Sequence, residues 1–138
     1  MAAKVLVVED DPAARRLVSF ALEQDGYEVL TASNGLEGLA KAQTERPEIL
    51  VLDVMLPGLD GFEVCRRLRA DTETAGVLVL MLSAKAQESD KTTGLKMGAD
   101  DYLAKPADPL EVAARVKTLL QQKAAGPVQI SSGAGSGG

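Results

Sequence analysis

Residues 5–11 read VLVVEDD, and residues 49–53 read ILVLD. In each stretch four apolar residues are followed at once by carboxylates, and such short apolar runs are typical of strands buried on both faces. If the two strands are parallel neighbours, Glu9, Asp10 and Asp53 meet at one edge of a sheet. Crowded carboxylates are unfavourable unless a cation binds among them. The sequence therefore predicts a site for a hard divalent metal ion.

Apolar runs alternate with amphipathic segments along the rest of the chain, a pattern typical of βαβ units. We predict five strands, at about residues 4–9, 27–31, 48–53, 77–82 and 101–104, with helices in the intervals. The predicted fold is a doubly wound α/β domain, with a five-stranded parallel sheet of the flavodoxin-like (βα)5 type. The common strand order for such a sheet is 2-1-3-4-5.

Several predicted helices begin with a recognisable cap. Asp11 and Asp108 each precede a proline, and Asp60 is followed three residues later by Glu63. Capping alone is therefore a sufficient explanation for Asp11. The first and last helices carry apolar stripes that we expect in the core, at Ala14, Leu17, Val18 and Ala21 and at Leu110, Ala113, Val116 and Leu120.

The length of 138 residues suits one domain, which we place at residues 1–124. Residues 125–138 are rich in glycine and serine, so we interpret them as a flexible tail, a linker or an artefact of expression. No apolar run approaches the roughly 20 residues that cross a bilayer, and no signal-peptide pattern is present. We expect a cytoplasmic protein that does not bind membranes.

The charge and the residue types present exclude several kinds of chemistry. The net charge is -5 and the basic residues are scattered, which argues against direct nucleic-acid binding. The chain has no histidine, which excludes a Ser-His-Asp triad and an imidazole zinc site. The single cysteine, Cys65, has helical spacing with apolar neighbours and is interpreted as a core thiol.

A candidate site follows from the predicted topology. Ligands of open α/β sheets bind beyond the carboxyl ends of the strands, at the point where the strand order reverses. Asp53, Ser83 and Lys105 follow three different strands and should reach that edge together with the acidic residues of the first loop. Each residue alone could be an ordinary loop residue, but the combination is difficult to assemble by chance.

Four motifs give the chain a resemblance to the response-regulator receiver domains of two-component signalling, the CheY-like superfamily, over residues from about 4 to 123. They are VVEDD at residues 7–11, LDVMLPGLDG at 52–61, MLSA at 81–84 and GADDYLAKP at 98–106. The resemblance implies that Asp53 accepts a phosphoryl group from a histidine kinase or phosphotransfer protein. Such a domain is a switched regulator that catalyses only its own phosphorylation and dephosphorylation.

The resemblance also implies roles for the neighbours of Asp53. Asp10 and Asp53 would ligate Mg²⁺, with Mn²⁺ as an alternative, while Glu9 would hold a coordinated water and Met55 would offer its backbone carbonyl. Lys105 would pair with the carboxylate and later with the phosphoryl group.

Further residues would transmit the signal. Ser83 would donate its hydroxyl to the phosphoryl group, and Tyr102 would be the switch residue that turns into the space left behind. The bond between Lys105 and Pro106 is cis in this family.

The expected output face comprises the fourth helix, fifth strand and fifth helix, and binds a downstream protein or an output domain. Its charges could also pair across a phosphorylation-dependent homodimer, although exposed ion pairs stabilise little. The candidate dimer residues are Lys91, Asp100, Asp101, Glu111 and Arg115.

The chain departs from the family pattern at Ala107, where a bulky apolar residue is usual, so partner packing at this loop is open. Lys85 and Met55 lie at the predicted mouth of the site, and we expect them to tune hydrolysis of the acyl phosphate.

Two other classes share parts of the pattern. A phosphatase of the haloacid dehalogenase type would need Asp-x-Asp, where this chain has Met55. A flavodoxin-like cofactor binder or a dinucleotide binder would need a hydroxyl- or glycine-rich first loop, where this chain has acids.

Overall fold

The computed structural model describes residues 2–83 and 88–125, without the side chains of residues 88–91. It contains one sheet of five parallel strands in the order β2-β1-β3-β4-β5. The strands are β1 (Lys4–Val8), β2 (Glu28–Ala32), β3 (Ile49–Asp53), β4 (Leu78–Ser83) and β5 (Asp101–Ala104). The predicted fold is confirmed, and each strand end lies within one residue of its predicted position.

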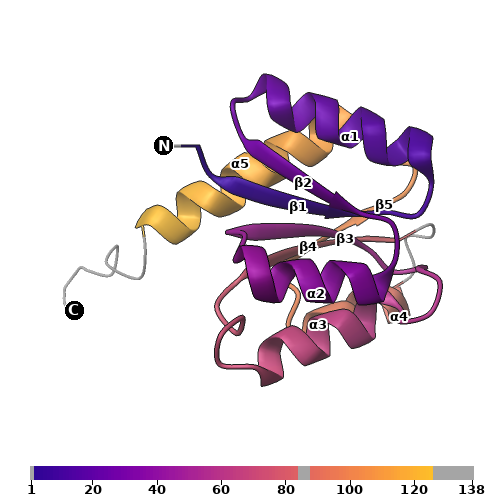
Figure 1. Cartoon of the computed structure of the whole chain (residues 1–138). Helices are drawn as coiled ribbons and strands as arrows, with labels where there is room; N and C mark the ends of the chain where they lie inside the picture. Colours follow the sequence, from indigo (N-terminus) through magenta and orange to yellow (C-terminus); the bar gives the residue numbers. More distant parts are fainter. Residues whose placement is uncertain (1, 84–87, 126–138) are drawn as a thin grey trace.

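Helices cover both faces of the sheet, as Figure 1 shows: α1 and α5 lie on one face, and α2, α3 and α4 on the other. The helices are α1 (Pro12–Gln24), α2 (Gly35–Glu45), α3 (Gly61–Ala70), α4 (Glu88–Lys96) and α5 (Pro109–Ala125). Ala125 is still helical, one residue past the predicted domain end. The predictions for Lys85 and for residues 126–138 lie outside the described residues.

Side-chain caps start the helices where the sequence predicts them. Asp11 accepts hydrogen bonds from the backbone of Ala13 and Ala14, and Asp60 accepts one from Glu63 N at 2.9 Å. Asp108 accepts one from Leu110 N at 2.8 Å. These carboxylates satisfy N–H groups that have no partner within the helix.

The core lies in two layers, one on each side of the sheet, because both faces of the central strands are apolar. Val18, Ala21 and Leu22 form the buried stripe of α1, and Leu17 is 59% exposed. Leu110, in the first turn of α5, is 72% exposed. The prediction that both leucines are core residues is wrong, because each lies at the margin of the buried stripe of its helix.

Arg69, near the end of α3, ties together three segments at the amino end of β4. Its guanidinium donates to the carbonyl oxygens of Gly98 and Val77 and, at 3.0 Å, to Asp100 Oδ2. The same carboxylate oxygen accepts a hydrogen bond from Val79 N at 2.8 Å. Arg69 thus joins α3, the start of β4 and the turn between α4 and β5.

Replacing Arg69 should weaken the fold. In Arg69→Met the aliphatic stem remains, but the carboxylate and the carbonyl oxygens lose their donor. We expect the free energy of unfolding to fall by about 2 kcal/mol, since hydrogen bonds to charged groups are among the stronger ones. Urea denaturation followed by circular dichroism measures this change.

The matched control is Arg67→Met, because Arg67 pairs with Glu63 on the surface of the same helix. An exposed pair contributes only about 0–1 kcal/mol. Equal losses in the two variants would contradict a special role for Arg69.

Candidate functional site

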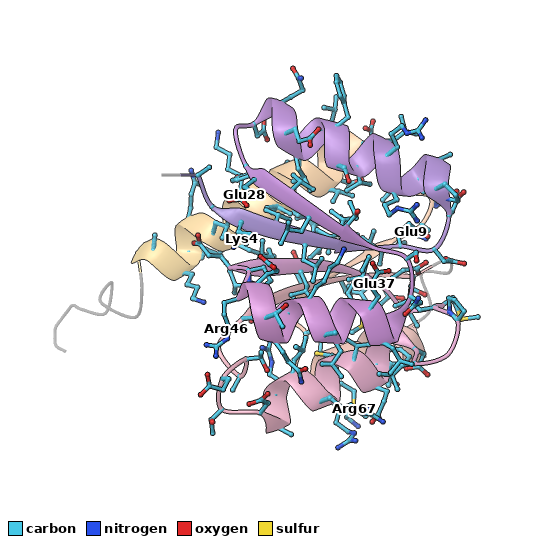
Figure 2. All side chains as sticks on the ribbon, viewed as in Figure 1. Lys4, Glu9, Glu28, Glu37, Arg46 and Arg67 are labelled. Atoms are coloured by element: carbon cyan, nitrogen blue, oxygen red, sulfur yellow. The ribbon has the colours of Figure 1, made fainter. Side chains whose placement is uncertain are left out.

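Three carboxylates meet where β1 and β3 end. Glu9, Asp10 and Asp53 each offer an oxygen atom, and these oxygens all lie within 4.8 Å of one another. The cause is the direct parallel pairing of β1 with β3, in which Val8 stands opposite Leu52. Glu9 and Asp53 are only 5% and 3% exposed, whereas Asp10 is exposed. Figure 2 shows Glu9 at this end of the sheet, with Lys4 at the opposite end of β1.

Lys105 bridges the two buried carboxylates. It directly follows β5, and its Nζ donates to Glu9 Oε1 at 2.7 Å and to Asp53 Oδ2 at 2.9 Å. Its backbone N–H donates to the carbonyl oxygen of Ser83, at the end of β4. The predicted pairing with Asp53 is thus present, and the pairing with Glu9 is an addition that the sequence did not predict.

Two opposing effects act on the pKa of Lys105. Burial lowers it, because a buried ammonium loses its hydration. The hydrogen bonds to Glu9 and Asp53, together with the charges of these carboxylates, act in the opposite direction and raise the pKa above its ordinary value. Lys105 therefore stays protonated at neutral pH, as a fixed positive charge beside Asp53.

Arg15 holds the loop between β1 and α1, a role that sequence reasoning missed. Its Nη1 donates to the carbonyl oxygen of Glu9 at 2.8 Å and to that of Asp10 at 3.5 Å. The backbone N–H of Asp11 donates to Glu9 Oε2 at 3.1 Å. The only available signal was a basic residue in the first turn after an acidic loop, which many solvated helices share.

The loop after β3 packs closely around Asp53. The backbone N–H of Met55 donates to Asp53 Oδ1 at 3.3 Å, while the Met55 side chain is 70% exposed. A Cβ on Gly61 would lie 2.4 Å from the carbonyl oxygen of Asp53. Only glycine fits at that position, so the start of α3 fixes the backbone of Asp53.

The remaining candidates lie on the last two strands. Ser83 is 2% exposed and is the last residue of β4, next to β3. The peptide bond between Lys105 and Pro106 is cis. Tyr102 is 9% exposed and belongs to the core layer on the side of α2, α3 and α4. The structure thus brings Ser83 and Lys105 to one sheet edge and places the side chain of Tyr102 in the core layer.

The acidic cluster fits a hard divalent cation. Its donors are carboxylate oxygens, which Mg²⁺ and Mn²⁺ prefer. Two of them are buried, which makes their negative charge costly without a counter-charge. The donor set thus suits Mg²⁺ in type and in charge.

Three of the five candidate dimer residues, Asp100, Asp101 and Arg115, have partners within the chain. Arg115 Nη1 donates to Asp101 Oδ2 at 2.8 Å, and Asp100 pairs with Arg69 at 3.0 Å. Glu111 is exposed in the first turn of α5. The side chain of Lys91 lies outside the described part of the chain. Any contact between two copies through Asp101 or Arg115 must replace the intrachain pair.

Removing the charge of Asp53 should lower the pKa of Lys105. In Asp53→Asn one of the two partners is neutral, while burial still favours the uncharged amine. An NMR titration of the Lys105 side chain measures the shift. Asp10→Asn is the control, because among the described residues the Lys105 ammonium bonds Glu9 and Asp53 but not Asp10.

The raised pKa of Lys105 determines how the stability of the fold changes with pH. The pairing stabilises the fold fully below the pKa of an unfolded lysine, about 10.4, and is lost as the pH rises through the higher folded value. Alkaline loss of stability should therefore be steeper in the parent chain than in Asp53→Asn. If stability fell equally steeply with pH in both chains, the pairing of Lys105 with Asp53 would not be the cause of the raised pKa.

Known proteins share the fold of this chain and much of its sequence. The family model of the response regulator receiver domain matches residues 5–117. The chain is 52% identical over 119 residues to the alkaline phosphatase synthesis transcriptional regulatory protein PhoP of Bacillus subtilis, covering 86% of this chain and 49% of that protein. The DNA-binding dual master transcriptional regulator RpaA of Synechocystis is 50% identical, with the same coverage of both chains.

A solved CheY-like response regulator receiver domain from Methanospirillum hungatei superposes with a TM-score of 0.84 at 29% identity, covering 91% of this chain and 98% of that one. The chain spans about half the length of the curated relatives it matches. Within the described residues, no helix is long and apolar enough to cross a membrane. The predicted cytoplasmic location stays a prediction. The family model, the sheet order and the acidic edge agree: this chain belongs to the response-regulator receiver domain family.

Proposed function

We propose that Asp53 is the phosphoacceptor of this receiver domain, and that a histidine kinase or phosphotransfer protein supplies the phosphoryl group. The observation that carries the proposal is the pairing of the buried Asp53 carboxylate with Lys105 at 2.9 Å, beside two further carboxylates. A carboxylate held at the end of a strand by a single lysine is positioned to act as a nucleophile.

The transfer needs no general base from this chain. One carboxylate oxygen of Asp53 attacks the phosphorus, the P–N bond of the phosphohistidine breaks, and its electron pair returns to the imidazole of the donor. The product is an acyl phosphate on Asp53. Because a carboxylate is already ionised near neutral pH, the chain only has to position and stabilise it.

Each neighbour has a separate role in this proposal. Asp10 and Asp53 would hold Mg²⁺ directly, with Glu9 through water and Met55 through its carbonyl. Bound there, the ion supplies positive charge to the oxygens of the transferred phosphoryl group. Lys105 keeps its proton on Nζ and donates to one phosphoryl oxygen, and Ser83 donates its hydroxyl to another.

Met55 occupies the position where a phosphatase of the haloacid dehalogenase type has its second aspartate. A thioether neither donates nor accepts a proton as an acid–base catalyst. This chain therefore lacks the group that such phosphatases use for turnover, which favours a stored acyl phosphate.

We further propose that Tyr102 relays the state of Asp53 to α4. A Cβ on Gly94 of α4 would lie 2.9 Å from Met81 Sδ and 3.7 Å from Tyr102 Cδ2. The glycine thus lets α4 pack closely over Met81, with the tyrosine ring within van der Waals distance of the same position. Movement of Ser83 toward the phosphoryl group would bias this packing between two arrangements, as a population shift.

Intact mass after incubation with Mg²⁺ and acetyl phosphate tests the phosphoacceptor. We expect the parent chain to gain one phosphoryl group and Asp53→Asn to gain none. Chelation of Mg²⁺, or Asp10→Asn, should slow the gain strongly, because the charge of the phosphoryl oxygens is then poorly neutralised. Labelling of Asp53→Asn at the parent's rate would refute the assignment.

Phosphorylation should also promote dimerisation through α4, β5 and α5. We propose that Asp101 and Arg115 exchange their intrachain pair for pairs between copies, with Lys91, Asp100 and Glu111 contributing. Sedimentation velocity at micromolar concentration should show a dimer only for the phosphorylated chain. Arg115→Gln should weaken it, whereas Arg16→Gln, on α1, should not. Monomeric phosphorylated protein would contradict the proposal.

A further inference from the structure

The loop between β1 and α1 carries two of the three carboxylates of the acidic cluster, Glu9 and Asp10. The Glu9 side chain is buried and held at both oxygens: Oε1 accepts from Lys105 Nζ at 2.7 Å, and Oε2 accepts from the backbone N–H of Asp11 at 3.1 Å. The Asp10 side chain is exposed and makes no hydrogen bond or ion pair within the described residues. The position of Asp10 must therefore come from the backbone of the loop.

Arg15, in the first turn of α1, holds that backbone. Its Nη1 donates to the carbonyl oxygen of Glu9 at 2.8 Å and, at 3.5 Å, to that of Asp10. The Glu9 carbonyl belongs to the planar peptide unit that joins Glu9 to Asp10. A bond to this oxygen therefore fixes the plane from which the Asp10 side chain departs. The bond is charge-assisted, and such bonds are roughly twice as strong as neutral ones.

Arg15 itself stands on a fixed base. Its backbone N–H donates to the carbonyl oxygen of Asp11 at 2.9 Å, and Asp11 caps α1. At the other end of the loop, the backbone N–H of Glu9 donates to the carbonyl oxygen of Ala32, the last residue of β2, at 3.0 Å. The loop is thus anchored at both ends, and the guanidinium of Arg15 holds its middle.

We infer that Arg15 is a positioning residue for the metal site, and that it holds the peptide between Glu9 and Asp10 in the arrangement that suits Mg²⁺. The inference rests on the proposed function, in which Asp10 and Asp53 bind the ion. Mg²⁺ requires near-ideal octahedral geometry with oxygens at about 2.0–2.1 Å, whereas Ca²⁺ accepts a more flexible arrangement at about 2.3–2.6 Å. A firmly held loop thus favours Mg²⁺ over Ca²⁺, and Arg15 determines this preference.

The positive charge of Arg15 acts in the opposite direction. A guanidinium near a cation site repels the cation, so removal of its charge alone would strengthen the binding of any divalent ion. If positioning outweighs repulsion, removal of Arg15 weakens binding instead, and it does so more for Mg²⁺ than for Ca²⁺. The sign of the change and its dependence on the ion therefore separate positioning from electrostatics.

The test compares three chains: the parent, Arg15→Met and the control Arg16→Met. Both variants lose one positive charge on α1 and keep an aliphatic side chain. Arg16 is exposed and, in the part of the chain that the structure describes, makes no hydrogen bond to the loop. MgCl2 or CaCl2 is titrated into each unphosphorylated chain at fixed ionic strength, and the amide signals of Asp10 and Asp53 are followed by NMR.

We expect Arg15→Met to raise the Kd of Mg²⁺ by about tenfold, an effect typical of the loss of a group that orients metal ligands. The Kd of Ca²⁺ should rise by a smaller factor, and Arg16→Met should keep the parent's preference between the two ions. An unchanged or lower Kd of Mg²⁺ in Arg15→Met would overturn the inference. Equal losses for the two ions, or an equal loss of Mg²⁺ affinity in Arg16→Met, would overturn it as well.

A second variant serves if circular dichroism shows that Arg15→Met does not fold. Arg15→Lys keeps the charge and the aliphatic stem, but its ammonium lies one bond closer to the backbone than Nη1 and lacks the planar fork. Its Mg²⁺ affinity should fall below that of the parent, with the Ca²⁺ affinity less affected. The outcomes that decide for Arg15→Met then decide for Arg15→Lys.

The rate of labelling by acetyl phosphate gives a second readout. Arg15→Met should need more Mg²⁺ to reach half of its maximal rate, because the ligands of the ion are less well placed. Its rate at saturating Mg²⁺ should approach that of the parent, since Arg15 contacts the loop and not Asp53. A low rate at saturating Mg²⁺ with an unchanged requirement for the ion would contradict the positioning role.

The inference and the proposed function fail in different ways. If Mg²⁺ shifts no amide signal of the parent, the proposed metal site is wrong and the inference falls with it. If the parent binds Mg²⁺ but takes no phosphoryl group, the assignment of Asp53 as the phosphoacceptor is wrong, while the Kd values still decide the role of Arg15. If the parent binds Mg²⁺ and is labelled, but Arg15→Met binds both ions as the parent does, only the inference is wrong.

Discussion

The site depends on one electrostatic arrangement, a single lysine held between two buried carboxylates. Glu9 and Asp53 end neighbouring strands, and each is at least nine-tenths buried, so their charges are poorly hydrated. Lys105 contacts both and supplies a positive charge that offsets the cost of burying two carboxylates side by side. Because Glu9, Asp53 and Lys105 come from three strands, the pairing also fixes how the ends of β1, β3 and β5 are placed. The proposed nucleophile, Asp53, is thus positioned by the packing of the fold itself.

The residues of this edge were predictable because parallel strands have a fixed polarity. Once apolar runs identify the strands, whatever follows each run must reach the same edge, and Asp53, Ser83 and Lys105 do so. The pattern of apolar runs did not predict which of these side chains contact one another. The bonds from Lys105 to Glu9 and from Arg15 to two loop carbonyls depend on rotamers and on the path of the first loop, neither of which has a periodic signal in the sequence.

The exposed leucines illustrate a different limit. Periodicity identifies the apolar side of a helix, but the width of the buried stripe depends on what packs against it. Leu17 and Leu110 continue the apolar spacing of α1 and α5, yet they are 59% and 72% exposed, because each lies at the margin of the buried stripe of its helix.

The fifth strand places the proposed switch residue, Tyr102, close to Lys105 and the proposed phosphoacceptor site. β5 has only four residues, and it carries Tyr102 beneath α4 while Lys105 follows directly and bonds Asp53, the proposed phosphoacceptor. Its backbone is paired along β4, where Ser83 stands opposite Ala104. A shift of Ser83 or Lys105 toward a phosphoryl group must act on this short paired segment, because it has no loop within it to absorb the change. Gly94 of α4 packs closely over Met81 and lies beside the Tyr102 ring, so α4 is the element that such a shift would reach first.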